Sequence, residues 1–176
     1  MKDIYIRLEE SFKSTNLIKQ RDDLYFVSMP KDRVIPALKH LRDNEGFTHL
    51  VMLTAVDYIE DGEFELNYLL HNHQLKITLG VKTRIDRENA EMQTFHELWG
   101  QCETYERELH EMFGIYFPGS PRLDENFLLE GWDQIPPMRR DFDTLQYSKE
   151  NYYFNKKRKS NDPRTYMQQK GDKRGK

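Results

Sequence analysis

Two carboxylates flank a guanidinium at Glu106, Arg107 and Glu108, which is the arrangement in this chain nearest to acid–base chemistry. Paired carboxylates act as general acid and general base only where both can reach one reacting group. On a helix, consecutive residues point about 100° apart, so Glu106 and Glu108 do not share a face. Arg107 instead has Glu103 four residues before it and Glu111 four residues after it. This spacing favours a ladder of ion pairs along a helix over a catalytic pair.

Histidines offer a second source of chemistry. His71 and His73 flank Asn72 at a spacing that can put two metal ligands on one side of a strand. No third Cys, His or carboxylate follows at ligand spacing, and the pair falls at an expected turn, so a surface turn is favoured over a metal site. His110 lies one helical turn after Glu106 and is predicted to pair with it.

The single cysteine, Cys102, limits the chemistry further. One thiol excludes a disulfide framework and a protein-held iron–sulfur cluster, which normally takes several thiolates. Cys102 occupies an apolar position of a predicted helix, where a thiol usually serves as inert packing. The glycine-rich motifs of dinucleotide, nucleotide and acyl-transfer sites are also missing. We therefore predict no catalytic, cofactor-binding or metal-binding residue in this chain.

Hydrophobic periodicity predicts the elements that position these residues. Strands are expected at 24–29, 49–56, 63–70 and 75–82, and helices at 3–14, 32–44 and 94–113. Asp61 and Gly62 form a strong hairpin signal between two of the strands. Alternation of apolar and polar residues along consecutive strands indicates an antiparallel sheet with one face in water. We therefore expect an α+β fold in which helices cover the other face of the sheet.

Helix ends can also be read from the sequence. Asp32 is predicted to cap a helix whose first turn contains Pro36, where a missing N–H is tolerated. The run from Thr94 to Glu97 resembles a capping box that opens the next helix, which Gly100 could divide into two. Gly114 is predicted to end that helix as its C-cap.

Regular structure is not expected after Gly114, because prolines and glycines interrupt the chain repeatedly. The apolar residues of this stretch lack any period: Phe117, Leu123, Phe127, Leu128, Leu129 and Trp132. Such a segment cannot easily pair its own backbone, so we expect it to lie over a neighbouring subunit and not on its own domain. The expected organisation is a scaffold domain at 1–115, a partner-wrapping segment at 116–155 and a basic tail at 156–176.

Two runs of charge suggest what such a segment contacts. Pro136 and Pro137 hold an extended backbone at low entropic cost, and Arg139 and Arg140 can fork onto carboxylates, so this strap suits an acidic partner surface. Residues 156–176 hold nine Lys or Arg and two Asp, a net charge of +7, whereas the whole chain carries −3. A free-standing module that uses this tail on nucleic acid or anionic lipid is therefore a rival hypothesis. The acidic body of the chain argues against nucleic acid.

The mean hydropathy is −0.90, and no window of the sequence resembles a membrane span. The N-terminus does not resemble a signal peptide. We therefore expect a cytoplasmic protein that reaches a membrane only through partners.

Several runs between Phe47 and Phe142 resemble the C subunit of bacterial complex I. The matching runs are Leu50–Tyr58, Glu106–Ile115, Gly119–Pro121, Trp132 and Pro137–Phe142. The chain departs from the usual pattern at Thr104-Tyr105, at Ser120 and at Asp124-Glu125. Leu109–Met112 is similar to relatives in ferredoxin- or hydrogen-linked complexes, which leaves the electron donor open.

This resemblance implies a scaffold subunit without cofactors in the peripheral arm of an NADH-quinone oxidoreductase or a hydrogenase-like relative. Its partners would be the large quinone-site or hydrogenase-like subunit (D-type), the small iron–sulfur subunit (B-type) and a ferredoxin-like iron–sulfur subunit. These partners would hold the iron–sulfur clusters and quinone, with FMN and NAD as further candidates, and would couple electron transfer to ion translocation. The chain would lie on the cytoplasmic side of the membrane. The residues implied at the partner interface are Glu106, Arg107, Glu108, Phe113, Gly114, Trp132, Pro136, Pro137, Arg139, Arg140 and Asp141.

Overall fold

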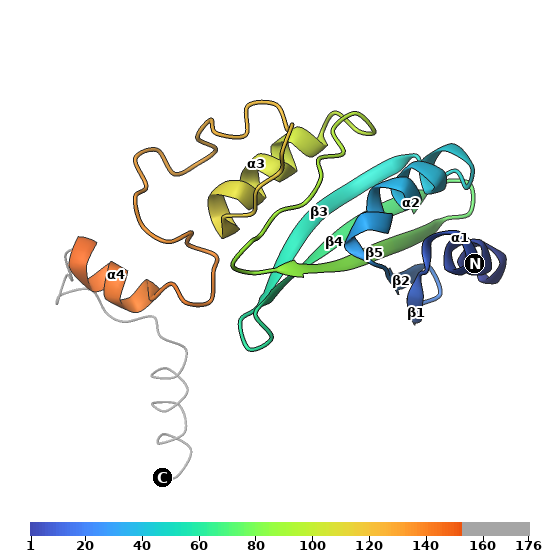
Figure 1. The fold of residues 1–176 in the computed structure, drawn as a ribbon, viewed down its shortest axis with the longest axis horizontal. Coiled ribbons are helices and arrows are strands. Elements are labelled where there is room, and N and C mark those ends of the chain that lie inside the picture. The colour runs from blue at the N-terminus through green and yellow to red at the C-terminus, as the bar shows by residue number, and fades with distance from the viewer. Residues whose placement is uncertain (153–176) are drawn as a thin grey trace, which may run out of the picture. The chain divides into compact units, whose positions relative to one another are not determined.

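The computed structural model describes residues 1–152, so the predicted basic tail at 156–176 lies outside the described residues. The chain divides into two compact units, Met1–Phe142 and Asp143–Lys176. The first unit contains α1 (Lys2–Phe12), β1 (Thr15–Arg21), β2 (Leu24–Ser28), α2 (Lys31–Asp43), β3 (His49–Tyr58), β4 (Glu63–Asn72), β5 (Ile77–Asp86) and α3 (Cys102–Phe113) (Figure 1). The described part of the second unit contains α4 (Thr144–Asn151), which was not predicted from the sequence.

The five strands form one sheet in the order β1-β2-β5-β4-β3. β1–β2, β4–β5 and β3–β4 pair antiparallel, but β2 and β5 pair parallel. The α+β class is thus confirmed, whereas the expected purely antiparallel sheet is wrong in one pair. The parallel pair arises because α2 and the β3–β4 hairpin separate β2 from β5, and such a crossover brings β5 alongside β2 in the same direction.

The predicted hairpin is present between β3 and β4, with Gly62 in its turn. Alternate residues of β4 face the core: Phe64, Leu66, Tyr68 and Leu70 are all fully buried. β1 was missed, because its residues are mostly exposed and mostly polar and so carry no alternation that sequence could reveal.

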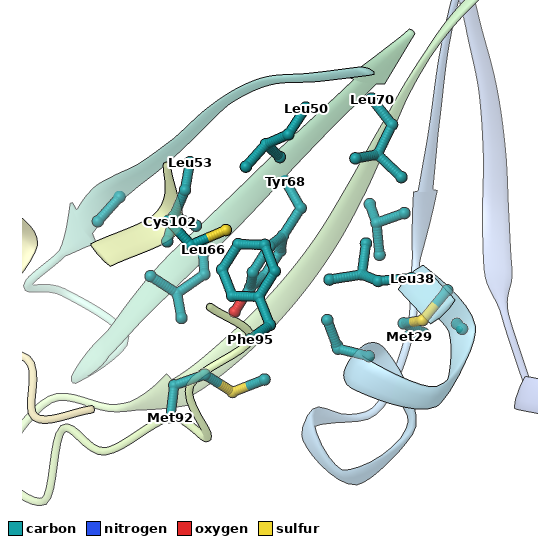
Figure 2. Close-up of a cluster of buried hydrophobic side chains, with 14 of the residues drawn as sticks. Met29, Leu38, Leu50, Leu53, Leu66, Tyr68, Leu70, Met92, Phe95 and Cys102 are labelled. Carbon is teal, nitrogen blue, oxygen red and sulfur yellow. The ribbon is translucent and has the colours of Figure 1, made fainter. Parts of the chain in front are cut away.

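Helices cover one face of the sheet, as predicted. Figure 2 shows the resulting core, where Leu38 of α2 and Cys102 of α3 meet Tyr68 of β4. α2 begins at Lys31 after Pro30, without a side-chain cap from Asp32. Pro36 therefore lies inside the helix and not in its first turn. At this interior position it costs the helix one backbone hydrogen bond.

The capping-box prediction at Thr94–Glu97 is wrong. Residues 94–101 are irregular, with turns at 96–98 and 100–101, and α3 begins only at Cys102. The reason is that the Thr94 hydroxyl and the Phe95 N–H both donate to the carboxylate of Glu106. The predicted C-cap is confirmed: Gly114 has a φ of 76°, and its N–H donates to the carbonyl oxygen of His110.

Candidate partner interface

Glu106 is an interior residue with 0% of its surface exposed. One carboxylate oxygen accepts from the Thr94 hydroxyl at 2.7 Å and the other from the Phe95 N–H at 3.0 Å. Burial first, and then the charge of Glu106, raise the pKa of both the Tyr68 hydroxyl and the Cys102 thiol. The first acid of the triplet therefore ties the 94–95 turn to α3 and points into the core.

Arg107 reaches out of α3 to the segment that follows it. Its Nη2 donates to the carbonyl oxygens of Glu125 at 3.2 Å and Asn126 at 3.0 Å. Its guanidinium carbon lies 5.9 Å from the centroid of the Phe127 ring, a cation–π distance. Arg107 thus holds two backbone carbonyls that would otherwise need water.

Glu111 completes the attachment one turn later. Its carboxylate accepts from the backbone N–H groups of Phe127 and Leu128, both at 2.8 Å, and of Leu129 at 3.1 Å. Burial alone would raise the pKa of Glu111, but these three N–H donors outweigh it and lower the pKa. We call residues 125–129 the clasped loop.

The predicted ladder of ion pairs along α3 is wrong within the described residues. Glu103 pairs with Arg122, and Glu111 binds backbone N–H groups, so neither forms an ion pair with Arg107. The expected His110–Glu106 pair is also wrong, because His110 Nδ1 lies 3.0 Å from the carbonyl oxygen of Ile115. The physical reason is the same in each case: the segment after Gly114 folds back over α3 and offers more numerous partners.

Glu108 differs from the other two members of the triplet. It is half-buried, and its side chain has no hydrogen bond or ion pair to another of residues 1–152. Phe113, by contrast, is buried and packs edge-on against Phe64, with ring centroids 5.9 Å apart. At Gly114 a Cβ atom would lie 3.3 Å from Cγ of Pro136, so the C-cap of α3 is also where the strap begins.

The strap, residues 136–141, is bonded to the sheet domain through its backbone. The N–H of Met138 donates to the carbonyl oxygen of Met112 at 3.0 Å. The N–H of Arg140 donates to the carboxylate of Asp57, at the end of β3, at 2.9 Å. These two bonds attach the strap to α3 and β3.

Side-chain charges reinforce this attachment. Nε and Nη2 of Arg87 donate to the two carboxylate oxygens of Asp57, at 2.8 and 3.1 Å. Nη2 also donates to a carboxylate oxygen of Asp141 at 2.8 Å. Arg140 binds Glu60 at 2.5 Å, and Arg139 lies 3.6 Å from Asp141. Burial would raise the pKa of Asp57, but the bonds from Arg87 and the Arg140 N–H outweigh it and lower the pKa.

Trp132 lies between the clasped loop and the strap. Its indole N–H donates to the carbonyl oxygen of Ile135 at 3.0 Å, and its ring lies 5.5 Å from that of Phe142. A cavity of about 250 Å³ lies beside it, with Glu111, Leu129 and Pro136 in its wall. The structure thus brings Trp132 and Pro136 together as predicted interface residues on one stretch of surface.

The apolar residues of the segment after Gly114 fall into two groups. Phe117 and Leu123 are buried in the chain's own core, so the expectation that they cover a neighbouring subunit is wrong. Leu128, Ile135 and Met138 are exposed by 72%, 45% and 56%. The segment therefore has an inner side fixed to its own domain and an outer apolar side, which we call the outer face.

No group of three or more His, Cys, Asp or Glu residues within residues 1–152 could hold a metal ion. The structure does bring His49 beside His73, with ring centroids 5.5 Å apart, and His71 lies 4.8 Å from His73. His73 lies in the turn after β4, as expected, whereas His71 lies within β4, which ends at Asn72. Among the helices of the same residues, none combines the length and apolar character needed to cross a bilayer.

Comparison with known proteins identifies the family of this chain. The model of the family described as "Respiratory-chain NADH dehydrogenase, 30 Kd subunit" matches residues 27–148, which is more than half of the chain. The chain belongs to this 30 Kd subunit family. The resemblance to the C subunit of complex I, found in the sequence, is thus confirmed.

Relatives from this family extend the match. The C subunit of the NADH-quinone oxidoreductase of Moorella thermoacetica is 31% identical over 71% of this chain and 84% of its own length. The C/D 2 subunit of the NADH-quinone oxidoreductase of Aquifex aeolicus is 29% identical over 77% of this chain but only 23% of its own length. A chain in the structure of the membrane-bound sulfane sulfur reductase, an archaeal respiratory membrane complex, superimposes with a TM-score of 0.80. It is 30% identical, and the match covers 92% of this chain and 96% of that chain.

Sequence reasoning missed the residues that hold the segment in place. Asp57, Arg87 and Glu111 each bind groups far along the chain. The spacing of Glu111 pointed to Arg107 and not to the backbone groups that it binds, and the spacing of Asp57 and Arg87 gave no signal. The available signal was a carboxylate at the end of an otherwise apolar strand, because Asp57 could be buried there only with a charged partner.

Proposed function

We propose that this chain is a cofactor-free scaffold subunit in the peripheral arm of a complex-I-type quinone oxidoreductase. In this proposal it holds the large quinone-site subunit (D-type) beside the small iron–sulfur subunit (B-type) and a ferredoxin-like iron–sulfur subunit. The partners carry the electrons, and the assembly couples their transfer to ion translocation. The chain itself lies on the cytoplasmic side of the membrane and meets the membrane only through the complex.

One observation carries the choice of the main partner. The relative from Aquifex aeolicus is named a C/D subunit, and this chain corresponds to only 23% of it. A single polypeptide named for both the C and the D subunit joins its C part covalently to its D part, so the two parts stay close to each other. We infer that this separate C-type chain lies against a separate D-type chain in the same way.

The geometry supports a docking role for the segment after Gly114. Its inner side is fixed by Arg107, Glu111 and Asp57, so its conformation is set before any partner arrives. The exposed apolar residues of the outer face are then presented on a rigid support, which lowers the entropic cost of association. Glu108, Arg139 and Arg140 supply polar and charged groups at the margin of such an interface. Residues 116–155 would thus be the partner-facing part and 1–115 its scaffold.

A second candidate is the equivalent subunit of a complex-I-like membrane complex with another donor or acceptor. The match to the archaeal sulfane sulfur reductase chain favours it, because that match covers nearly the whole of both chains. The two candidates differ in the reaction of the assembly and not in the role of this chain. An isolated complex that oxidises NADH supports the first, and one that uses reduced ferredoxin and not NADH supports the second.

The docking role is tested by placing charge on the outer face. Leu128→Glu combined with Met138→Glu should abolish co-purification of the D-type and iron–sulfur subunits with a tagged chain, because both side chains are exposed in the free subunit. The urea midpoint of the purified variant should stay unchanged. Leu75→Glu is the matched control, since Leu75 is an exposed leucine (49%) in the β4–β5 turn.

Intact co-purification of all partners with the double variant would refute the proposed docking surface. The rival module predicts a different result for the unaltered chain: tight, steeply salt-dependent binding to nucleic acid or anionic vesicles. Iron or flavin bound to the purified single chain would contradict its cofactor-free role.

A further inference from the structure

β3 forms one edge of the sheet and lies beside α3 (Figure 1), with β4 as its one strand neighbour. In an antiparallel pair, alternate residues direct their backbone N–H and C=O groups toward the neighbour, and the residues between them direct these groups away. The carbonyl oxygen of Leu50 points away from β4, because it accepts from the side chain of Gln101. Counted through β4, whose pairing with β5 has no register shift, the next outward-directed residues of β3 are Leu53 and Ala55.

The first half of this edge is covered by side chains of the same chain. Three carbonyl oxygens there accept hydrogen bonds at 2.6 to 3.0 Å: Thr48 from Trp99, Leu50 from Gln101 and Val51 from Tyr105. Within residues 1–152, no such bond reaches the outward backbone groups of Leu53 and Ala55. The second half of the β3 edge is therefore open for pairing.

The sequence of this edge offers no protection against another strand. Edge strands usually carry charges, prolines or bulges that prevent pairing with a second chain. β1, at the opposite edge, follows this rule with Lys19, Arg21 and two register shifts. Residues 50–56 hold no charged residue, and on the sheet face without helices Met52 and Val56 are exposed by 38% and 41%. An unpaired, uncharged edge with exposed apolar side chains favours the addition of a strand.

Glu108 lies along the same part of the edge. It follows Tyr105 by three residues, so both lie on one face of α3. Tyr105 bonds to Val51 of β3, and Phe113 packs against Phe64, near the other end of the β3–β4 pair. α3 therefore runs along the edge, and Glu108 falls between these two contacts. Its half-buried carboxylate has no hydrogen bond or ion pair to another of residues 1–152, so it can accept from a cation of a second polypeptide.

We propose that the second half of the β3 edge binds an extended segment of another subunit, which adds a strand to the five-stranded sheet. The backbone groups of Leu53 and Ala55 bond to the backbone of this segment. Met52 and Val56 contact its apolar side chains, and Glu108 accepts from a Lys or Arg that the segment carries. Main-chain bonds then supply affinity, and the single cation supplies specificity.

A second copy of this chain fits the edge less well than a different subunit. A symmetric pair brings the same patch together from both sides. Residues 50–56 carry no cation, so each Glu108 would remain unpaired in such a dimer. The inference rests on the proposed function in one respect, since the segment belongs to a subunit of the same assembly.

Amide hydrogen exchange, resolved by residue, tests the pairing directly. In the free chain, the amides of Leu53 and Ala55 should exchange at least about tenfold faster than those of Thr54 and Val56, whose N–H groups point to β4. In the complex purified through a tag on this chain, exchange at Leu53 and Ala55 should slow by about a hundredfold or more.

Three results of this experiment would count against the inference, each in a different way. Fast exchange at Leu53 and Ala55 in a complex that contains the partner subunits would overturn it and leave the proposed function standing. Absence of any co-purifying partner would refute the proposed function, and this inference with it. Protection of the same two amides in the free chain that grows with its concentration would assign the edge to a second copy and overturn the choice of occupant.

Substitutions at the edge provide a second measurement, the dissociation constant for the partner subunits. Val56→Lys should weaken association about tenfold or more and leave the urea midpoint unchanged, because Val56 is exposed in the free chain. Ile18→Lys is the matched control, since Ile18 is exposed by 53% on the opposite edge strand, and it should change association by less than about twofold. Glu108→Gln should weaken association about threefold or more and reduce its dependence on salt. Equal weakening by Val56→Lys and Ile18→Lys would contradict pairing at β3.

Discussion

At the scale of single residues, the charges of α3 stabilise the chain's own fold before they can serve a partner. Glu106 is buried, Arg107 binds two backbone carbonyls, and Glu111 binds three backbone N–H groups. Each of these groups satisfies backbone or hydroxyl atoms that lie outside regular structure, where unpaired polar groups would be costly. Glu103 of the same helix pairs with the Arg122 side chain instead, and the side chain of Glu108 has no hydrogen bond or ion pair to any of residues 1–152.

Glu106→Ala should lower the free energy of unfolding by about 2–4 kcal/mol, because it leaves the Phe95 N–H buried without an acceptor and removes the acceptor of the part-buried Thr94 hydroxyl. Glu106→Gln keeps one acceptor oxygen and should cost less. Urea unfolding of the purified chain measures both. Glu108→Ala, two positions along the same helix, should change the free energy by less than about 0.5 kcal/mol. An equal loss in the two alanine variants would show that burial of Glu106 is not what matters.

Cys102 gives stability a dependence on alkaline pH. Burial and then the nearby Glu106 raise the pKa of its thiol in the folded chain, whereas the unfolded thiol ionises near about 8.5. The folded state therefore holds this proton more tightly, so stability should fall as pH rises above about 8.5. Urea midpoints measured between neutral pH and pH 10 should fall less steeply for Cys102→Ala. Identical slopes for the two chains would contradict this assignment.

At the scale of elements, the strap and the clasped loop are separate attachments of one segment to the sheet domain. The clasped loop is bonded to α3, and the strap is bonded mainly to the end of β3 through Asp57. Asp57 also accepts hydrogen bonds from Nε and Nη2 of Arg87, the residue after β5. One carboxylate therefore connects β3, the end of β5 and the strap. Removing it should loosen the strap and leave the clasped loop in place.

Asp57→Asn should accelerate tryptic cleavage after Arg139 and Arg140, because the neutral amide binds Arg87 and the Arg140 N–H more weakly. In the unaltered chain, the strap should loosen in the same way in acid. The pKa of Asp57 is lower in the folded chain than in the unfolded chain, where it is about 3.9. The carboxylate therefore stabilises the fold above about pH 3.9, and this contribution is lost as the pH falls through the folded pKa. Amide exchange of Arg140 reports the loosening at low pH, where trypsin is inactive. Exchange of residues 127–129 serves as the control and should respond to Glu111→Ala and not to Asp57→Asn.

At the scale of the whole molecule, the boundary of the folded unit lies after the strap. Residues Met1–Phe142 form one compact unit, and its core includes Ile115, Phe117 and Leu123. A scaffold that ended at residue 115 would lose the buried side chains of Phe117 and Leu123 from this core. The partner-facing segment is therefore also a structural part of its own domain.

Truncation tests this boundary. A chain of residues 1–142 should unfold within about 0.5 kcal/mol of the full-length chain, because it contains every buried core residue found among residues 1–152. A chain of residues 1–115 should lose at least about 3 kcal/mol, since it lacks Phe117 and Leu123 and leaves Arg107 and Glu111 without their partners. Urea unfolding of the three chains gives the comparison. Equal stability of the 1–115 and 1–142 chains would place the boundary at residue 115.

The sequence by itself determined the elements whose signals are local. The β3–β4 hairpin followed from a nearly continuous apolar run and an alternating run on either side of Asp61 and Gly62, the core-facing side of β4 from its period of two, and the end of α3 from Gly114. The sequence also indicated the family, because the runs that match the C subunit of complex I are distinctive in residue type and spacing. These features depend on neighbours within a few residues, so one chain is enough to reveal them.

Only the tertiary structure decided which groups the charged residues bind. Glu106 meets Thr94 twelve residues away, Arg107 meets Asn126 nineteen residues away, and Arg140 meets Asp57 eighty-three residues away. The parallel pairing of β2 with β5 is equally non-local. Side-chain charges have many chemically equivalent partners along a sequence, and the fold selects among them by bringing backbone groups within hydrogen-bonding distance and excluding water from them.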